Sequence, residues 1–406
     1  MSSTTFIGTQ INALVEQVVN NRDPNARAGC SLAFSAVYTH AGGLAAQPYL
    51  KTVLNVLMSL GNDPHPVVHY WALHALGQIV SSSSLSYSPF IPNTLGMLFK
   101  VYVMESHEPE GGLLGNVNLA GDLPTYQVVC RITDGVISAL GPELQETGRT
   151  RSLILDLVSQ FASEVDDGVI VEAIYCIQHC LMFAPNVVDV PDLVKRFRTY
   201  LSSSKRTLKL ASINALYQLV QKDAFTMSRI GGDRLVEVLF GMLDDDSSVE
   251  GVRSIITSWL QQTVTAGPSG WIDLCQRIMA RTTASQQATE AVKNSTFQDD
   301  ESQSLSQEMQ TSGRVHVTAR WRTQLFALQC LHSICMTVAK SGRREHLDIP
   351  YARAQGIALQ GLLVQRVPDL IKMAFTASAA YVTEIRLEGL IVLRDVIEVR
   401  NKSFRT

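Results

Sequence analysis

The sequence predicts an all-α protein, a right-handed α-solenoid of about eight stacked helical hairpins. Three observations support this prediction: apolar residues recur at helical spacing, polar turns recur about every 40 residues, and alternating strand-like runs are weak. Hydrophobic residues make up 46% of the 406 residues, but charged residues make up only 17%, below the roughly 25% of average globular chains. This composition indicates helices that are covered on more than one side.

Polar turns define the repeat. Asp23 and Asp63 lie 40 residues apart, and each belongs to an Asp-Pro turn that precedes an apolar helix. Related turns follow at Asp166, Lys205 and Asp245, spaced by 39 and 40 residues. A period near 40 with two helices per unit is typical of HEAT and armadillo arrays.

Each unit is expected to contain a first helix, a tight turn and a second helix. In residues 149–165 the apolar residues recur at i, i+1, i+4, i+5 and i+8, which places them on one helical face. The partner helix also has an apolar face, and a lone hairpin cannot cover both faces, so neighbouring repeats must stack. Pro64 and Pro66 suit the turn and the start of the second helix, and Asp63 can accept hydrogen bonds from its first N–H groups.

Two segments interrupt the regular spacing. Residues 105–124 form a loop rich in Gly, Pro and Glu, and residues 284–314 form a polar insert rich in Ser, Gln and acidic residues. The insert is expected to be disordered because it cannot bury enough apolar surface to offset the entropy of ordering. The predicted organisation is therefore helical repeats in 1–283, the insert at 284–314, and further helical repeats in 315–406.

Three histidines, His65, His69 and His74, lie within ten residues and raise the question of a metal site. Zinc requires three or four ligands, and no Cys, Glu or further His at matching spacing completes such a set, so a structural role is favoured. The helix that carries them is expected to bury a stripe formed by Trp71, Ala72, Ala75 and Ile79.

A second cluster, Cys176, His179 and Cys180, lies on one helix and offers too few ligands for the same reason. The seven cysteines are an odd number, and most lie in apolar helical runs, which indicates reduced, buried thiols in a cytosolic protein. We expect no metal and no cofactor.

Enzymatic motifs are absent from the sequence: it contains no dinucleotide-binding or Walker glycine loop, no GxSxG and no HExxH. The chain is therefore predicted not to be an enzyme and to have no small-molecule substrate. The N-terminus lacks the features of a signal peptide, and no apolar run is long enough to cross a bilayer. A cytoplasmic protein that contacts membranes only indirectly is expected.

Charge is distributed unevenly. Residues 1–200 carry 10 Lys+Arg against 17 Asp+Glu, whereas 314–406 carry 14 against 7. The basic region would permit nucleic acid as a partner. Its Arg and Lys residues are scattered singly among apolar residues, however, which favours solvated helix faces and argues against nucleic acid.

Several segments carry a more specific signal than the repeat pattern, including Asn-Arg-Asp-Pro at 21–24 and Arg-Trp-Arg-Thr at 320–323. The full set is 20–44, 66–80, 140–145, 319–335, 369–377 and 385–397. In this order they closely resemble the central part of the large HEAT-repeat-containing protein five family. The resemblance covers nearly the whole chain apart from the loop and the insert. Neither end resembles a polar capping repeat, so exposed apolar end faces are expected, as in an internal segment of a longer protein.

The resemblance implies a protein-binding scaffold that associates with the clathrin adaptor complex of the trans-Golgi network and with its accessory proteins. It implies a peripheral location at the trans-Golgi network, endosomes and clathrin-coated vesicles, and a role in endosome-to-Golgi traffic. The alternative is a nuclear-transport-type or nucleic-acid-associated HEAT solenoid, which the basic region 314–406 would permit.

One short partner-binding motif is a further, weak candidate. Phe297, Asp299 and Asp300 lie in the insert and loosely resemble the acidic-phenylalanine peptides that adaptor appendage domains bind. The alternative is a solvated linker.

Overall fold

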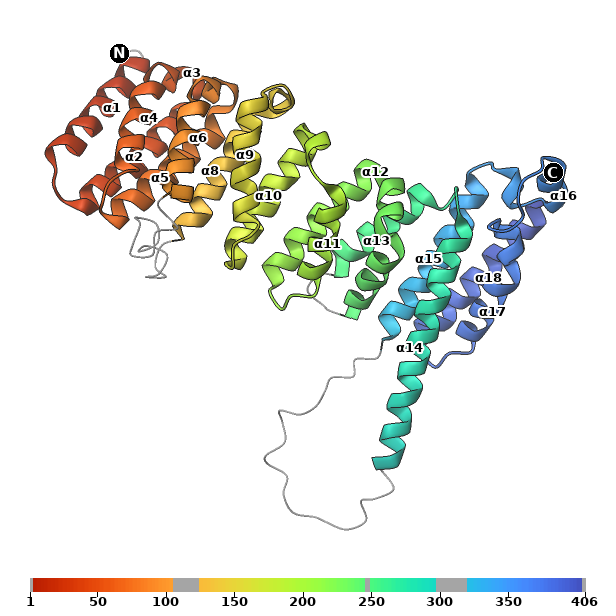
Figure 1. Cartoon of the computed structure of the whole chain (residues 1–406). Helices are drawn as coiled ribbons and strands as arrows, with labels where there is room; N and C mark the ends of the chain where they lie inside the picture. Colours follow the sequence, from red (N-terminus) through yellow and green to blue (C-terminus); the bar gives the residue numbers. More distant parts are fainter. Residues whose placement is uncertain (1–2, 105–123, 245–248, 297–319, 404–406) are drawn as a thin grey trace, which may run out of the picture. The chain divides into compact units, whose positions relative to one another are not determined.

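The fold is wholly helical in the part of the chain that the computed structural model describes, residues 3–104, 124–244, 249–296 and 320–403 (Figure 1). The predicted all-α class of stacked helical hairpins is confirmed. The chain divides into two compact units, Met1–Leu193 and Val194–Thr406. In these ranges, no helix combines the length and the apolar character needed to span a membrane.

The first unit is built from helical hairpins arranged in two layers (Figure 1). The second helices of the hairpins pack directly on one another in sequence order. They are α2 Pro24–Ala41, α5 Pro66–Ser83, α8 Thr125–Leu140 and α10 Asp167–Phe183. The first helices are α1 Ser3–Asn20, α4 Leu50–Leu60, α6 Ile91–Phe99 and α9 Gly148–Phe161, and the short α3 Gly43–Ala46 follows α2.

Aspartates at the turn positions start the second helices, as the spacing predicts. Asp23 accepts a hydrogen bond from the Asn25 N–H at 3.1 Å, and Asp166 accepts one from the Gly168 N–H at 2.8 Å. Each carboxylate satisfies a donor that has no partner within the helix. Lys205 differs, because its side chain makes no capping hydrogen bond. The predicted turn residue Asp245 lies outside the described residues.

Large apolar side chains fill the space between the two layers of the first unit. Tyr38 and Tyr87 are buried in this core with their hydroxyls satisfied: the Ser83 hydroxyl donates to the Tyr38 hydroxyl at 3.1 Å, and the Tyr87 and Thr94 hydroxyls lie 2.6 Å apart. Pairing these groups avoids the cost of burying a lone polar atom. Fully buried residues of this core include Phe34, Leu50, Leu54, Leu57, Tyr102 and Phe161.

The predicted stripe on α5 is confirmed except for one residue. Ala72, Ala75 and Ile79 are fully buried. Trp71 is only half-buried, so its assignment to the buried stripe was wrong. It is turned about 100° from Ala72 around the helix axis, and its ring packs edge-on against Tyr70, 5.1 Å away between ring centroids.

The second unit has longer and less regular helices. The boundary helix α11 Val190–Leu201 precedes α12 Arg206–Gly241, which is broken at Asp223 and at Gly231. Gly231 has φ of +145°, a conformation that favours glycine. The remaining helices are α13 Val249–Thr263, α14 Pro268–Thr296, α15 Trp321–Lys340, α16 Ile349–Ala354, α17 Val367–Ser378 and α18 Thr383–Ser403.

Close packing joins the helices of the second unit. Trp259 on α13 is 1% exposed, and its Nε1–H donates to the Ser228 hydroxyl of α12 at 2.8 Å. The helices α17 and α18 pack so closely at Gly389 that no side chain would fit there. A Cβ at this position would lie 2.8 Å from the Ser378 nitrogen and 2.9 Å from the Ala374 carbonyl oxygen.

The first part of the predicted insert is helical. The helix α14 continues to Thr296, so the expectation of disorder was wrong for residues 284–296. This stretch contains no Gly or Pro, and seven of its 13 residues are Ala, Gln, Glu or Lys, which favour helix without requiring burial. The remainder of the insert, 297–314, and the loop 105–123 lie outside the described residues.

Apolar side chains are exposed on both terminal helices, to different extents. On α1, Phe6 is 59% exposed, but Ile7 and Ile11 are buried. On α18, Leu387, Leu390 and Ile397 are more than half exposed, but Val392, which was expected on the same exposed face, is fully buried. The predicted exposed end faces are therefore confirmed only in part on both helices.

Candidate functional site

The turn between α4 and α5 is a structural joint. Asp63 is 7% exposed; its Oδ1 accepts a hydrogen bond from the His65 N–H at 2.9 Å, and its Oδ2 pairs with Nη2 of Arg27 on α2 at 2.6 Å. The predicted hydrogen bond from Asp63 to the first N–H groups of α5 is wrong in detail, because its partner His65 lies in the turn just before α5 begins at Pro66. The ion pair with Arg27 was not predicted, because the two residues are far apart in the sequence. One carboxylate thus orders the turn that leads into α5 and links it to α2 of the preceding repeat.

The three histidines near this joint occupy different environments. His65 is exposed in the turn, His69 is completely buried on α5, and His74 is half-buried one and a half turns further along. Burial lowers the pKa of His69 to about 4, an effect that the Gly61 carbonyl and the Asp63 carboxylate only partly oppose. His69 is therefore a neutral core residue at neutral pH. In the part of the chain that is described, no three His, Cys, Asp or Glu side chains are arranged to hold a metal ion.

The cluster on α10 is also built for packing. Cys176 and Cys180 are buried free thiols, and burial raises the pKa of Cys176 strongly and that of Cys180 to about 12. A protonated thiol is a poor metal ligand and a poor nucleophile. His179 faces Asp134 of α8, with Nδ1 2.6 Å from Oδ1, and this hydrogen bond raises the pKa of His179. The pair connects neighbouring second helices.

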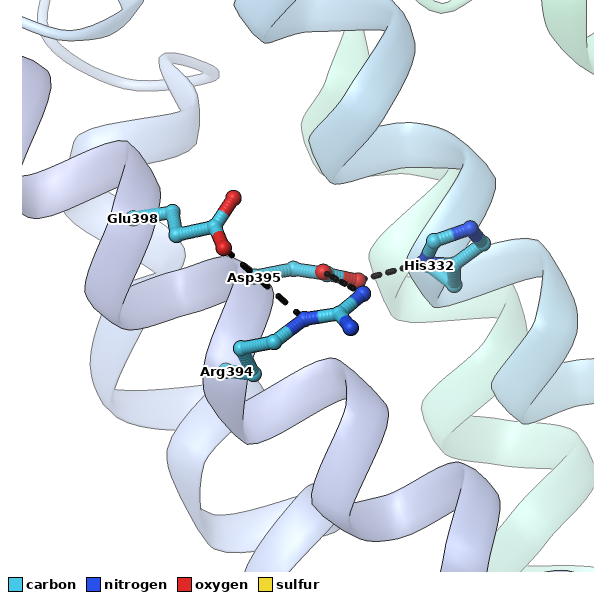
Figure 2. A network of polar contacts seen from close by, with 4 residues as sticks. All are labelled: His332, Arg394, Asp395 and Glu398. Atoms are coloured by element: carbon cyan, nitrogen blue, oxygen red, sulfur yellow. Dashed lines mark hydrogen bonds and ion pairs between the residues drawn. The ribbon is translucent and has the colours of Figure 1, made fainter.

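A second histidine–aspartate pair connects helices in the other unit (Figure 2). Asp395 on α18 is 1% exposed and contacts the Nδ1 atom of His332 on α15. Arg394 also reaches this carboxylate, with Nη2 3.1 Å from Oδ1, and its Nε lies 3.9 Å from Glu398. Burying a carboxylate is costly unless it is paired, and these partners supply the pairing. The network holds α15 against α18; sequence reasoning missed it because its partners are 63 residues apart.

A groove runs across the second helices α2, α5 and α8 of the first unit. We call this feature the α2–α5–α8 groove. Its volume is about 740 Å³, within the range of roughly 300–1,000 Å³ that is usual for ligand pockets. It is lined by Leu32, Ser35, Ala36, Thr39, His40, His74, Gly77, Gln78, Ser81, Ser82, Val128 and Arg131.

Polar groups in the groove are held in place by contacts between repeats. The Ser35 hydroxyl on α2 donates to the Gln78 side-chain carbonyl on α5 at 2.7 Å. Arg131 on α8 pairs through Nε with Glu172 of α10 at 2.8 Å, and its side chain is 52% exposed. Burial, and to a smaller extent the charge of Arg131, lower the pKa of His74, so this imidazole is neutral at neutral pH.

The second unit contains two smaller candidates. A polar groove of about 710 Å³ between α12 and α13 includes Gln221, whose Nε2 donates to the Ser258 hydroxyl at 2.7 Å. A pocket of about 310 Å³ lies beside Trp259 and Trp271. Sequence reasoning identified none of these grooves, because each is assembled from helices whose register is set by packing.

The weak partner-binding candidates Phe297, Asp299 and Asp300 lie outside the described residues. Their role stays a prediction.

Comparison with known proteins first gives the class. A HEAT repeat family model matches residues 53–83, which include most of α4 and all of α5. The solved structure of Kap121p bound to Pho4p has a similar fold, with a TM-score of 0.50 and 13% identity, and the match covers 98% of this chain and 36% of that one. The protein is a HEAT-type helical repeat protein.

Two further matches point to one family. A family model described as the Laa1/Sip1/HEATR5 HEAT repeat region matches residues 362–403, which contain α17 and α18. Protein SWEETIE of Arabidopsis thaliana is 23% identical over 415 residues. The chain is therefore similar to the Laa1/Sip1/HEATR5 family, and the resemblance seen in the sequence is confirmed. The match with SWEETIE covers 98% of this chain but only 18% of SWEETIE.

Proposed function

We propose that the chain is part of a non-enzymatic, protein-binding scaffold in clathrin-adaptor-dependent membrane traffic between endosomes and the trans-Golgi network. The observation that carries the protein-binding part is the α2–α5–α8 groove, a ligand-sized surface in a HEAT-type array. In this groove the Ser35, Thr39 and Ser81 hydroxyls donate hydrogen bonds to amide and backbone carbonyl oxygens and not to a base. This arrangement supports recognition and offers no activated nucleophile.

The adaptor part of the proposal rests on the similarity to the Laa1/Sip1/HEATR5 family and on the sequence blocks that resemble the large HEAT-repeat-containing protein five family. Partners would be the clathrin adaptor complex of the trans-Golgi network and its accessory proteins. The protein would be cytoplasmic and peripheral at the trans-Golgi network, endosomes and clathrin-coated vesicles, reaching membranes through those partners. No cofactor and no small-molecule substrate are part of the mechanism.

Affinity purification of the intact protein from cells tests this proposal. Co-purifying proteins would be identified by mass spectrometry and compared with those recovered by an unrelated HEAT-repeat protein carrying the same tag. We expect adaptor and accessory subunits to be enriched with the intact protein only. Their absence, in an extraction that preserves the adaptor complex itself, would contradict the adaptor part of the proposal.

A nuclear-transport-type or nucleic-acid-associated solenoid is the alternative function. The similarity in fold to Kap121p and the excess of basic residues in 314–406 favour it. Its test is binding to duplex and single-stranded nucleic acid at several salt concentrations. Affinity that falls steeply with salt would support it, because phosphate contacts release counterions.

A further inference from the structure

The chemistry of the α2–α5–α8 groove favours a particular kind of protein ligand. Its lining residues include one arginine, two histidines, one glutamine and several hydroxyls, and none of them is a carboxylate. The only full positive charge in the lining is that of Arg131. A single arginine without lysines would anchor one acidic side chain, but it would neutralise too few phosphates to hold a nucleic acid.

Arg131 is oriented for such a contact. Its Nε pairs with Glu172, whose side chain is only 13% exposed, and this ion pair restrains a guanidinium that lines the groove. Within the described part of the chain its ion pair uses Nε alone, which leaves the two terminal amino groups to donate to a carboxylate in the forked geometry that arginine favours.

Gln78 supplies the complementary contact. The Ser35 hydroxyl donates a hydrogen bond to the side-chain carbonyl oxygen of Gln78 at 2.7 Å and thereby orients the Gln78 amide. The Nε2 group of this exposed side chain then has two N–H donors for a peptide carbonyl. Gly77 beside it lets α8 pack closely on α5, since a Cβ at this position would lie only 3.3 Å from Cγ1 of Ile132.

We propose that the α2–α5–α8 groove binds an extended peptide segment with an acidic side chain, whose carboxylate pairs with Arg131 and whose backbone pairs with the amide of Gln78. Leu32 is 36% exposed at the groove and offers an apolar contact beside these polar ones. This inference rests on the protein-binding part of the proposed function and is independent of the adaptor part.

A charge inserted into the groove tests the proposal directly. A library of random peptides of about twelve residues, displayed on phage, would be selected against the intact protein, and enriched peptides would be synthesised for fluorescence anisotropy. Gln78→Glu keeps the acceptor for Ser35 but places a negative charge in the groove. Gln160→Glu makes the same change on an exposed face of α9, outside the groove, and serves as the matched control.

We expect the enriched peptides to be rich in Asp and Glu. Gln78→Glu should weaken their binding about tenfold, because like charges repel strongly in a partly desolvated site, and Gln160→Glu should leave it unchanged. Arg131→Gln should also weaken binding, with Arg149→Gln on α9 as its control. Thermal melts would establish that each variant is folded.

The proposal would be overturned if the selection enriched no peptides, or if the enriched peptides lacked acidic residues. Equal effects of Gln78→Glu and Gln160→Glu on peptide binding would also overturn it. Displacement of the peptide by a single-stranded oligonucleotide at equal concentration would identify a nucleic-acid surface instead. The outcome is separable from the adaptor hypothesis: if adaptor subunits still co-purify with the Gln78→Glu protein, the groove proposal can fail while the proposed function stands.

Discussion

The buried histidine of α5 gives the first unit a pH-dependent stability that can be calculated. His69 is fully buried, and among the described residues neither ring nitrogen has a hydrogen-bond partner. Its pKa is lowered from 6.5 to about 4 in the folded state. The unfolded chain therefore binds more protons than the folded chain between these two values, and stability is lost as pH falls from 6.5 towards 4.

The size of the effect follows from the two pKa values. The full shift corresponds to about 3 kcal/mol of unfolding free energy, and at pH 5 the loss is about 2 kcal/mol relative to neutral pH. The substitution His69→Phe replaces the titrating ring with an apolar ring of similar shape. The variant should therefore lose about 2 kcal/mol less than the parent protein between pH 7.5 and pH 5.

Urea unfolding followed by circular dichroism at the two pH values measures this difference. Other titrating groups are the same in both proteins, so their contributions to the pH dependence of the unfolding free energy cancel in the comparison. The same substitution at the exposed His65, His65→Phe, provides a control for replacing a histidine of this region with an apolar ring. Identical pH dependence in the parent and in His69→Phe would refute the reasoning, because it would mean that His69 accepts a proton without cost in the folded protein.

Other predictions concern packing, helix starts and thiols. Gly389→Ala should lower the unfolding free energy by about 2 kcal/mol, because the new Cβ would clash with backbone atoms of α17. The control Gly96→Ala adds a Cβ that meets no atom within 4 Å, so it should raise the unfolding free energy by up to about 1 kcal/mol. Thermal melts measure both changes. Asp63→Ala should lower the unfolding free energy by about 3 kcal/mol and Asp23→Ala by about 1 kcal/mol, since Asp63 also pairs with a partly buried arginine. Equal losses in the two variants would contradict the role of Asp63 as a joint between repeats. The seven cysteines are buried, so a thiol reagent should react slowly with the native protein and completely in guanidinium; rapid reaction of several thiols in native buffer would show that these helices are not packed as described.

The sequence was sufficient to predict the repeat architecture, because that architecture follows from local physical constraints. The turn aspartates at 23, 63 and 166 are identified by their spacing. Asp23 and Asp166 accept hydrogen bonds from N–H groups of the helices that follow them, whereas Asp63 accepts one from His65 in the turn before its helix. Helical periodicity likewise identified the buried side of α5. The exceptions were local: Trp71 lies at the margin of the stripe, and α14 extends into the insert because its residues favour helix.

The candidate site could not be predicted, because it depends on contacts between repeats. Arg131 and Glu172 are 41 residues apart, and Ser35 and Gln78 are 43 apart. The side-chain pairs that form the α2–α5–α8 groove are fixed by how α2, α5 and α8 pack, and a single sequence carries no signal for that register. Of the clustered histidines His65, His69 and His74, which raised the question of a metal site, only His74 lines the groove.

Direct binding between the intact protein and the purified clathrin adaptor complex of the trans-Golgi network, measured by biolayer interferometry with no other protein present, is the most direct test of the scaffold function. We predict saturable binding that needs no nucleotide or metal. Absence of binding to the adaptor complex and to its accessory proteins, together with salt-sensitive binding to nucleic acid, would contradict the account.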